Sequence, residues 1–429
     1  MLRALAHANF RIYFFGQGVS LIGTWMQQVA MTWLLYDLKH STLLLGVFGF
    51  ASQIPTFLVT PMAGVLTDRW DRQRTLYLTQ TVALVQAIVL TVLTACGWIE
   101  VWSLLALSVC LGLVNAFDIP ARQAFLTEMV ATPDDRANAI ALNSSLFNGA
   151  RLVGPALAGF VIAATGEWFC FLLNAVSYLA VLAALARMRV PLRALHQSHP
   201  PLLHGLREGL VYAFRFPPIR SLLGLVALVS FMSMAMSVLM PVFATKIFGG
   251  GAETLGQLTA AQGLGALAGA LYLASRRTVL GLAKRIALAS AMVGAGMIGF
   301  SWSGGFWTGA VFLAITGCGV MVQMAACNTI LQTIVDDDKR GRVISLHAMA
   351  FMGTAPLGSL AAGALANLFG APLTVRLGGL GCLVGSALFV SQLSRLRSHI
   401  RPIYERIGIL PEIATGMEVA SELTGPRRT

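Results

Sequence analysis

The chain alternates long apolar runs with short polar segments that hold most of its charges. Twelve of these runs reach the roughly 20 mostly apolar residues that a helix needs to cross a bilayer. They lie near residues 10–36, 41–66, 75–97, 101–121, 138–165, 168–187, 219–245, 254–275, 283–302, 305–333, 342–369 and 372–395. The pattern predicts an all-α integral membrane protein with twelve transmembrane helices.

A segment of the first half of the chain recurs in the second half at a constant offset of 204 residues. Arg136 corresponds to Arg340, and four glycines keep the same register. The glycine pairs are Gly149 with Gly353, Gly154 with Gly358, Gly159 with Gly363, and Gly166 with Gly370. Glycines held in register along a helix mark places where another backbone comes close. The repeat relates the fifth run to the eleventh, a displacement of six spans. Because an even number of spans keeps the orientation in the membrane, the repeat predicts two parallel six-helix bundles.

The longest polar stretch separates the two repeated segments and is interpreted as a linker. Its apolar residues recur at helical spacing, which predicts an amphipathic helix at the membrane surface. These residues are Leu203, Leu206, Leu210, Val211 and Phe214. We therefore expect an N-terminal bundle over 1–187, a cytoplasmic linker over 188–218, a C-terminal bundle over 219–395 and a cytoplasmic tail over 396–429.

Composition supports the membrane assignment, because 56% of the residues are hydrophobic, 11% are charged and the mean hydropathy is +0.74. A soluble protein of this size has about 25% charged residues. Most of the Lys and Arg residues fall in loops on one side of the predicted membrane, which places both termini in the cytoplasm. Topology thus explains the net charge of +12. Nucleic acid is not expected as a partner, since no basic face is interleaved with aromatic residues.

Enzyme functions are not supported by the sequence. Gly294-Ala-Gly296-Met-Ile-Gly299 matches a dinucleotide fingerprint, but it lies inside an apolar run without a preceding strand. The six cysteines are scattered and form no CxxC pair, so no metal site is expected. We expect neither catalytic residues nor a cofactor.

The most distinctive polar motif joins the second and third predicted spans and runs Gly64-Val-Leu-Thr-Asp68-Arg69-Trp-Asp71-Arg72-Gln-Arg74. The charges of so short a loop must pair with one another, with phosphates or with nearby helix ends. Gly64 would let a neighbouring helix approach, and Asp68 would then face the positive amino-terminal end of that helix. An ordinary positive-inside loop is the alternative interpretation.

This motif resembles the Gly-x-x-x-Asp-Arg signature of the major facilitator superfamily, and the resemblance extends over about residues 9–395. Asp71 stands where the signature usually has glycine, a variant associated with the drug and siderophore exporters of the family. The resemblance implies a conformational latch that holds the cytoplasmic ends of the two bundles together when the carrier opens outward. Gly64, Asp68, Arg69, Asp71, Arg72 and Arg74 would form this latch.

A second motif in the fifth span, Gly154-Pro155-Ala-Leu-Ala-Gly159, resembles the Gly-Pro-x-x-Gly-Gly motif of antiporter and exporter branches. Proline removes a backbone donor and kinks the helix, while glycines allow tight packing. Structural packing is the alternative to a role in export. The resemblance implies export by antiport, with protons as the expected coupling ion.

Polar residues inside predicted spans are the remaining candidates, because they are costly in lipid. Arg151 lies near the middle of the membrane, where it either lines a cavity or gate or caps carbonyls freed by Pro155. Asn143 and Asn148 precede it on the same span. Asp118 and Arg122 are four residues apart, which predicts an internal ion pair, with a proton-coupling role for Asp118 as the alternative.

The family fold implies that helices one, four, seven and ten line a central cavity. Gln28, Met236, Gln323 and Asn328 on these helices would then belong to the substrate and ion pathway, together with Asp118, Arg122, Asn143, Asn148 and Arg151. Flexible thioethers and aromatic residues suit an amphipathic compound. We expect a monomeric exporter of small amphipathic compounds in the cytoplasmic membrane. A dedicated siderophore exporter and a non-transporting receptor or scaffold are the alternatives.

Overall fold

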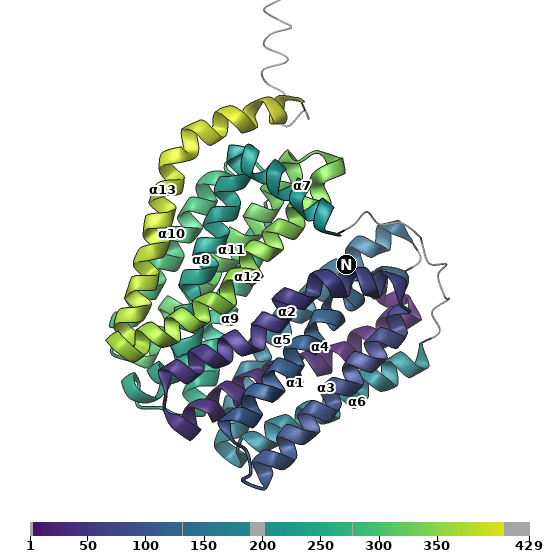
Figure 1. Cartoon of the computed structure of the whole chain (residues 1–429), viewed down its shortest axis with the longest axis vertical. Helices are drawn as coiled ribbons and strands as arrows, with labels where there is room; N and C mark the ends of the chain where they lie inside the picture. The colour runs from purple at the N-terminus through teal and green to yellow at the C-terminus, as the bar shows by residue number, and fades with distance from the viewer. Residues whose placement is uncertain (1–2, 131, 189–201, 277, 407–429) are drawn as a thin grey trace, which may run out of the picture.

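The computed structural model describes residues 3–130, 132–188, 202–276 and 278–406, and every regular element in these residues is helical (Figure 1). The first six long helices are α1 (Ala8–Lys39), α2 (Thr42–Arg69), α3 (Arg72–Ala95), α4 (Val101–Glu128), α5 (Pro133–Thr165) and α6 (Glu167–Arg187). The other six are α8 (Pro217–Val242), α9 (Ala252–Ala274), α10 (Leu282–Trp302), α11 (Phe306–Ile334), α12 (Asp337–Phe369) and α13 (Ala371–Arg406). The shorter elements are η1 (Arg3–Ala6), α7 (Leu202–Arg215) and η2 (Phe243–Ile247).

Ten of the described helices are long and apolar enough to cross a membrane by composition alone. The two long helices outside this group are α1 and α9. Both carry glutamines along their length, among them Gln17, Gln27 and Gln28 on α1 and Gln257 and Gln262 on α9. Gln17 and Gln27 are buried among other helices and need not face lipid. The predicted all-α membrane fold with twelve long helices is confirmed.

The two sets of six helices pack in the same way. We call α1–α6 the N half and α8–α13 the C half. In the N half α1 packs against α5 and α6, α3 against α4 and α6, and α2 against α4. The equivalent helices make the same pairs in the C half, where α8 packs against α12 and α13, α10 against α11 and α13, and α9 against α11. The repeat read from the sequence therefore corresponds to a repeated packing arrangement.

Three of the four repeated glycine pairs have equivalent positions in this packing. The exception is Gly149, which has no described atom within 4 Å of an added Cβ, whereas a Cβ on Gly353 would lie 2.3 Å from the Phe57 ring. A Cβ placed on Gly154 would lie 2.5 Å from the Cβ of Trp25 on α1, and one on Gly358 would lie 2.4 Å from the carbonyl oxygen of Phe231 on α8. Gly166 and Gly370 end α5 and α12 with φ angles of +91° and +83°, a region that favours glycine. Side chains at these positions would either clash or strain the backbone.

Two helix pairs make most of the contacts between the two halves, α2 with α12 and α5 with α9. A Cβ on Gly46 would lie 2.8 Å from the Cα of Gly363, and one on Gly256 would lie 2.5 Å from the carbonyl oxygen of Pro155. Both contacts lie near the end of the bundle at which α2 and α9 begin. We call this the outer-contact end, and we call the other end, where α2 and α9 finish, the basic end.

The halves separate toward the basic end. Contacts between them continue to the middle of the helices, where Phe57 of α2 meets Gly353 of α12 and Leu152 of α5 meets Gly263 of α9. Farther on, no described atom lies within 4 Å of a Cβ placed on Gly64. Figure 1 shows the same arrangement, with α2 crossing α12 at one side and the halves apart where α7 and the amino terminus lie.

The basic end also holds both described ends of the chain. The Asn138 side chain of α5 accepts a hydrogen bond of 3.0 Å from the Ala4 backbone N–H of η1. Helix α13 continues to Arg406, past residue 395 where the sequence placed the end of the span, because Leu396, Ile400 and Tyr404 form a buried stripe at helical spacing. The linker helix α7 packs on α12, where Glu208 and Arg342 are 2.6 Å apart.

Candidate functional site

Arg151 lies near the middle of α5, where α5 meets α1 and α9. Its guanidinium carbon is 5.8 Å from the ring centroid of Trp25 on α1. The Trp25 ring in turn contacts Phe147 edge-on at 5.8 Å between centroids. Within the described residues the Arg151 side chain makes neither a hydrogen bond nor an ion pair. An intramembrane cation beside aromatic rings and without an anionic partner is the most unusual feature of the interface between the halves.

Gly154, Pro155 and Gly159 position this part of α5. Pro155 has no N–H, so the carbonyl of Arg151, four residues earlier, has no helical donor. That carbonyl oxygen lies 3.5 Å from the place of a Cβ on Gly263 of α9. A Cβ on Gly159 would lie 2.9 Å from the Cα of Glu253, also on α9. The exporter-type motif therefore occupies the interface between the halves and allows the two backbones to touch.

The expected ion pair between Asp118 and Arg122 is present on α4. Asp118 is 1% exposed and also accepts hydrogen bonds of 2.9 Å from Thr79 and 2.7 Å from Gln80 on α3. Three donors, one of them charged, therefore stabilise the carboxylate inside the N half. It lies between α3 and α4, away from the helix pairs that join the two halves.

The latch segment folds as a helix end, a turn and a helix start. Asp71 caps α3, since its carboxylate accepts a 2.8 Å hydrogen bond from the Arg74 backbone N–H. Arg72 forms an ion pair of 2.6 Å with Glu128 at the end of α4. Arg69 and Arg74 are exposed. The Asp71 cap and the Arg72–Glu128 ion pair both lie within the N half and do not join it to the C half.

Gly64 and Asp68 are the latch residues expected to meet a neighbouring helix. A neighbouring helix was expected to lie close to Gly64. In this conformation no described atom lies within 4 Å of a Cβ placed on Gly64. The side chain of Asp68 lies outside the described part of the structure, although the backbone of α2 extends to Arg69. The latch role therefore stays a prediction.

Sequence reasoning missed a buried amide network in the N half. Gln27 of α1 donates to Gln86 of α3 at 2.9 Å, and Asn174 of α6 donates to Gln27 at 2.8 Å. Gln86 also donates to the Leu107 carbonyl of α4 at 3.2 Å. All three amides are at most 2% exposed. The network ties four helices of one half together, and the only sequence signal for it was the presence of amides within apolar runs.

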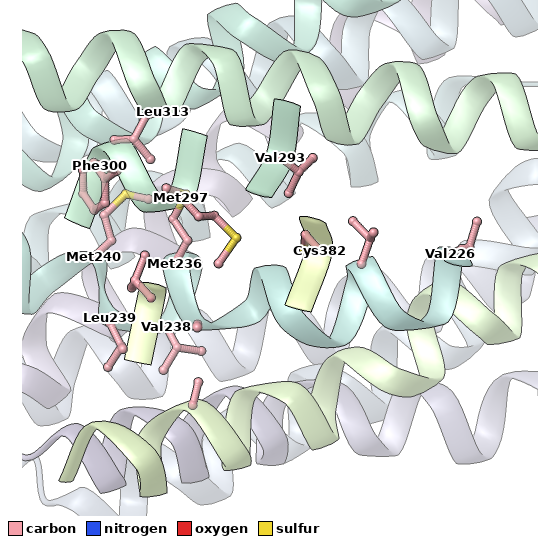
Figure 2. Packing of buried hydrophobic residues seen from close by; sticks show 14 of the residues in the cluster. Val226, Met236, Val238, Leu239, Met240, Val293, Met297, Phe300, Leu313 and Cys382 are labelled. Carbon is pink, nitrogen blue, oxygen red and sulfur yellow. The ribbon is translucent and has the colours of Figure 1, made fainter. Parts of the chain in front are cut away.

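The other predicted substrate contacts do not gather in one place. Met236 is completely buried, and Figure 2 shows it packed beside Met240, Met297 and Phe300 in the core of the C half. Gln323 is 3% exposed and donates to the Leu225 carbonyl at 3.4 Å. These two residues stabilise the C half in this conformation.

The predicted polar residues outside that core differ in exposure. Asn148 donates to the Ser144 carbonyl of its own helix at 2.8 Å, so its amide nitrogen is turned away from Arg151. Gln28 is exposed, and Asn143 and Asn328 are partly buried. Among the predicted pathway residues, only Arg151 lies at the interface between the halves and carries a charge that pairs with no described residue.

The chain matches a known family and known transporters over most of its length. The family model MFS_3, described as transmembrane secretion effector, matches residues 1–402. The staphyloferrin A transporter of Staphylococcus aureus is 25% identical to this chain, and the match covers 90% of this chain and 97% of the relative. The multidrug efflux pump Tap of Mycolicibacterium fortuitum is 27% identical, with 80% of this chain and 85% of the relative covered.

Among solved structures, the chain is similar to a bacterial homologue of the iron transporter ferroportin in an inward-facing state. The TM-score is 0.69 at 17% identity, and the match covers 90% of this chain and 98% of that chain. At this identity the likeness shows a common fold.

Proposed function

Because the chain belongs to the transmembrane secretion effector family of the major facilitator superfamily, we propose that it is a secondary active transporter that exports small amphipathic compounds by alternating access. The two halves would rock about the interface formed by the pairs α2 with α12 and α5 with α9. The similarity to the staphyloferrin A transporter favours siderophores as a second class of substrate.

One observation supports this proposal above the others. The halves touch from the outer-contact end to the middle of the bundle, and they are apart at Gly64. The excess of Lys and Arg at the loops of the basic end supports a cytoplasmic position for that end. In this orientation the structure would correspond to a carrier open to the cytoplasm, ready to take a substrate from inside the cell.

The register of α2 against α12 suggests which residues the latch segment contacts when the basic end is closed. Gly46 faces Gly363 and Phe57 faces Gly353, so α2 and α12 run antiparallel in a nearly constant register. Extending this register places Gly64 opposite Ser345 and Asp68 near the start of α12. A helix start attracts a carboxylate through its free N–H groups, so closing the basic end would be favoured by Asp68.

The contacts of Asp118 do not support a role for this residue in proton coupling. Its carboxylate is held by Arg122, Thr79 and Gln80, and binding a proton would remove the negative charge that pairs with Arg122. We therefore assign Asp118 and Arg122 to the stability of the N half. We place the substrate pathway between the halves, with Arg151 as its charged residue.

A disulfide across the outer contact tests the proposed function. In a variant without the native cysteines, Gly49→Cys and Ser359→Cys would join α2 to α12, because a Cβ on Gly49 lies 2.8 Å from the Cβ of Ser359. A disulfide holds its Cβ atoms at about 3.8 Å, so a small separation of the helices accommodates it. We expect oxidation to abolish export of fluorescent amphipathic compounds from cells, and a reductant to restore it.

The matched control places the cysteines at the basic end, as Gly64→Cys with Ser345→Cys. This pair should cross-link slowly, and only when the carrier closes toward the cytoplasm. If the oxidised Gly49–Ser359 protein exports as fast as the reduced protein, the halves do not part at this contact. A protein that exports none of the compounds tested, including a range of siderophores, would support the scaffold alternative.

A further inference from the structure

We propose that the exported compound carries an acidic group, a carboxylate, sulfonate or phosphate, that binds the guanidinium of Arg151. An adjoining planar apolar part would lie against Trp25 and Phe147. This inference rests on the proposed function and narrows its substrate to amphipathic anions.

No described protein group neutralises the charge of Arg151. At 1.5 Å per residue, Arg151 is about 27 Å along α5 from Pro133 and about 21 Å from Thr165. An arginine side chain cannot reach the water at either membrane surface over such a distance. A cation at this depth normally pairs with an anion or faces an aqueous pathway.

Acidic residues are absent from this region of the described structure. Asp118 is the one described carboxylate well inside a span, and it is paired with Arg122 between α3 and α4. The remaining described acids lie at helix ends, in turns or, for Glu208, on the linker helix α7. These are Asp37, Asp71, Glu100, Glu128, Asp135, Glu167, Glu208, Glu253, Asp336 and Glu405. Glu253 belongs to the neighbouring α9 but lies ten residues, or about 15 Å, from Gly263, which contacts Arg151.

The structure also argues against a purely structural role for Arg151. The side chain donates to no carbonyl among the described residues, so it does not cap the carbonyl groups freed near Pro155. Its contact with Trp25 is a cation–π interaction, which leaves the hydrogen-bonding edge of the guanidinium available. This edge carries paired donors that match the two oxygens of an acid group.

The aromatic neighbours explain why an amphipathic anion would bind better than a small inorganic one. Trp25 and Phe147 meet edge to face beside the guanidinium, and Phe147 is 44% exposed. A planar apolar group next to the acid could stack on these rings while the acid meets Arg151. A cationic amphipathic compound would meet the same rings but would be repelled by the guanidinium.

A pair of fluorescent probes tests the charge preference directly. Anilinonaphthalene sulfonate and N-phenylnaphthylamine share one aromatic skeleton and differ by the sulfonate. Binding would be measured in nanodiscs by energy transfer from the protein's tryptophans, with empty nanodiscs as the background. We expect the sulfonate to bind wild type at least about 10-fold more tightly, because a charge-assisted contact is worth a factor of this order or more.

Three variants assign this preference to Arg151. Arg151→Gln should weaken sulfonate binding about 10- to 100-fold and leave neutral-probe binding within about 3-fold, while Arg151→Lys should retain part of the preference. Arg376→Gln is the matched control, since Arg376 also stacks on a tryptophan, Trp302 at 5.9 Å, but near the outer-contact end of α13. It should leave both affinities unchanged. Unchanged neutral-probe binding also shows that the variants are folded.

Several results would overturn the proposal. The first is that the two probes bind wild type equally well. The second is that the sulfonate does not bind above the empty nanodisc, and the third is that Arg151→Gln weakens the binding of both probes equally. Export is measured separately in proteoliposomes. A wild-type protein that shows the binding preference but moves neither probe would contradict the proposed function while leaving the anion site in place.

Discussion

Gly265→Ala is expected to lower the melting temperature of the purified protein sharply and to reduce its yield in the membrane. A Cβ on Gly265 of α9 would lie 1.8 Å from the carbonyl oxygen of Ala314 on α11, and one on Gly317 would lie 2.0 Å from that of Gln262. The obstructing atoms belong to backbone, so the two helices must move apart. Overpacking a core costs about 1–3 kcal/mol in ordinary cases, and a backbone clash exceeds this range.

Gly149→Ala is the matched control, because no described atom lies within 4 Å of a Cβ placed on Gly149 of α5. Both substitutions gain the same helix propensity, about 1 kcal/mol relative to glycine. The difference between the two melting temperatures therefore measures the packing of α9 on α11. Equal melting temperatures for the two variants would show that α9 and α11 are not in backbone contact.

Asp118→Asn is expected to destabilise the N half by about 3–5 kcal/mol, the usual cost of removing one partner of a buried ion pair. Asp118 is 1% exposed and the Arg122 side chain 18% exposed, so the Arg122 charge would lose its counter-ion in a largely buried place. The amide would also present donors where the carboxylate now accepts from Arg122. Thermal unfolding in detergent, followed by tryptophan fluorescence, measures the loss.

The double variant Asp118→Asn with Arg122→Gln separates stability from proton coupling. Removing both charges should recover much of the lost stability, because no unpaired charge stays buried. If the pair is structural, the double variant should also recover export. A double variant that is stable but does not export would assign a transport role to Asp118 and contradict our interpretation.

Much of the fold could be predicted because each span is encoded locally. An apolar run of bilayer length specifies a helix without reference to its neighbours, and the repeated glycines show that two such sets are related. The Asp118–Arg122 ion pair was predictable for the same reason, since both residues lie on one helix at a fixed spacing.

Contacts between distant helices could not be predicted in this way. Gln27, Gln86 and Asn174 lie on three helices, and only the folded structure shows that their amides meet. Met236 was expected to contact substrate because it lies on a cavity helix, but which face of that helix turns inward depends on packing against α12 and α13. The lack of an acidic partner near Arg151 likewise emerges only when all the described helices are assembled.

The central claim is that the two halves move as rigid bodies about their shared interface, and one distance measurement tests it most directly. Spin labels would be placed at Ala137 of α5 and Ala274 of α9 at the basic end, and in a second protein at Thr165 of α5 and Phe369 of α12 at the outer-contact end. All four positions are exposed. Both proteins would be measured in nanodiscs, with the Gly49–Ser359 disulfide oxidised and then reduced.

We predict that the oxidised protein shows only the long basic-end distance and the short outer-contact distance. Reduction should add a second population in which the basic-end distance is shorter and the outer-contact distance is longer. Reduced proteins that show only the oxidised distances at both ends, or two distances that lengthen together, would contradict the rocking of two rigid halves.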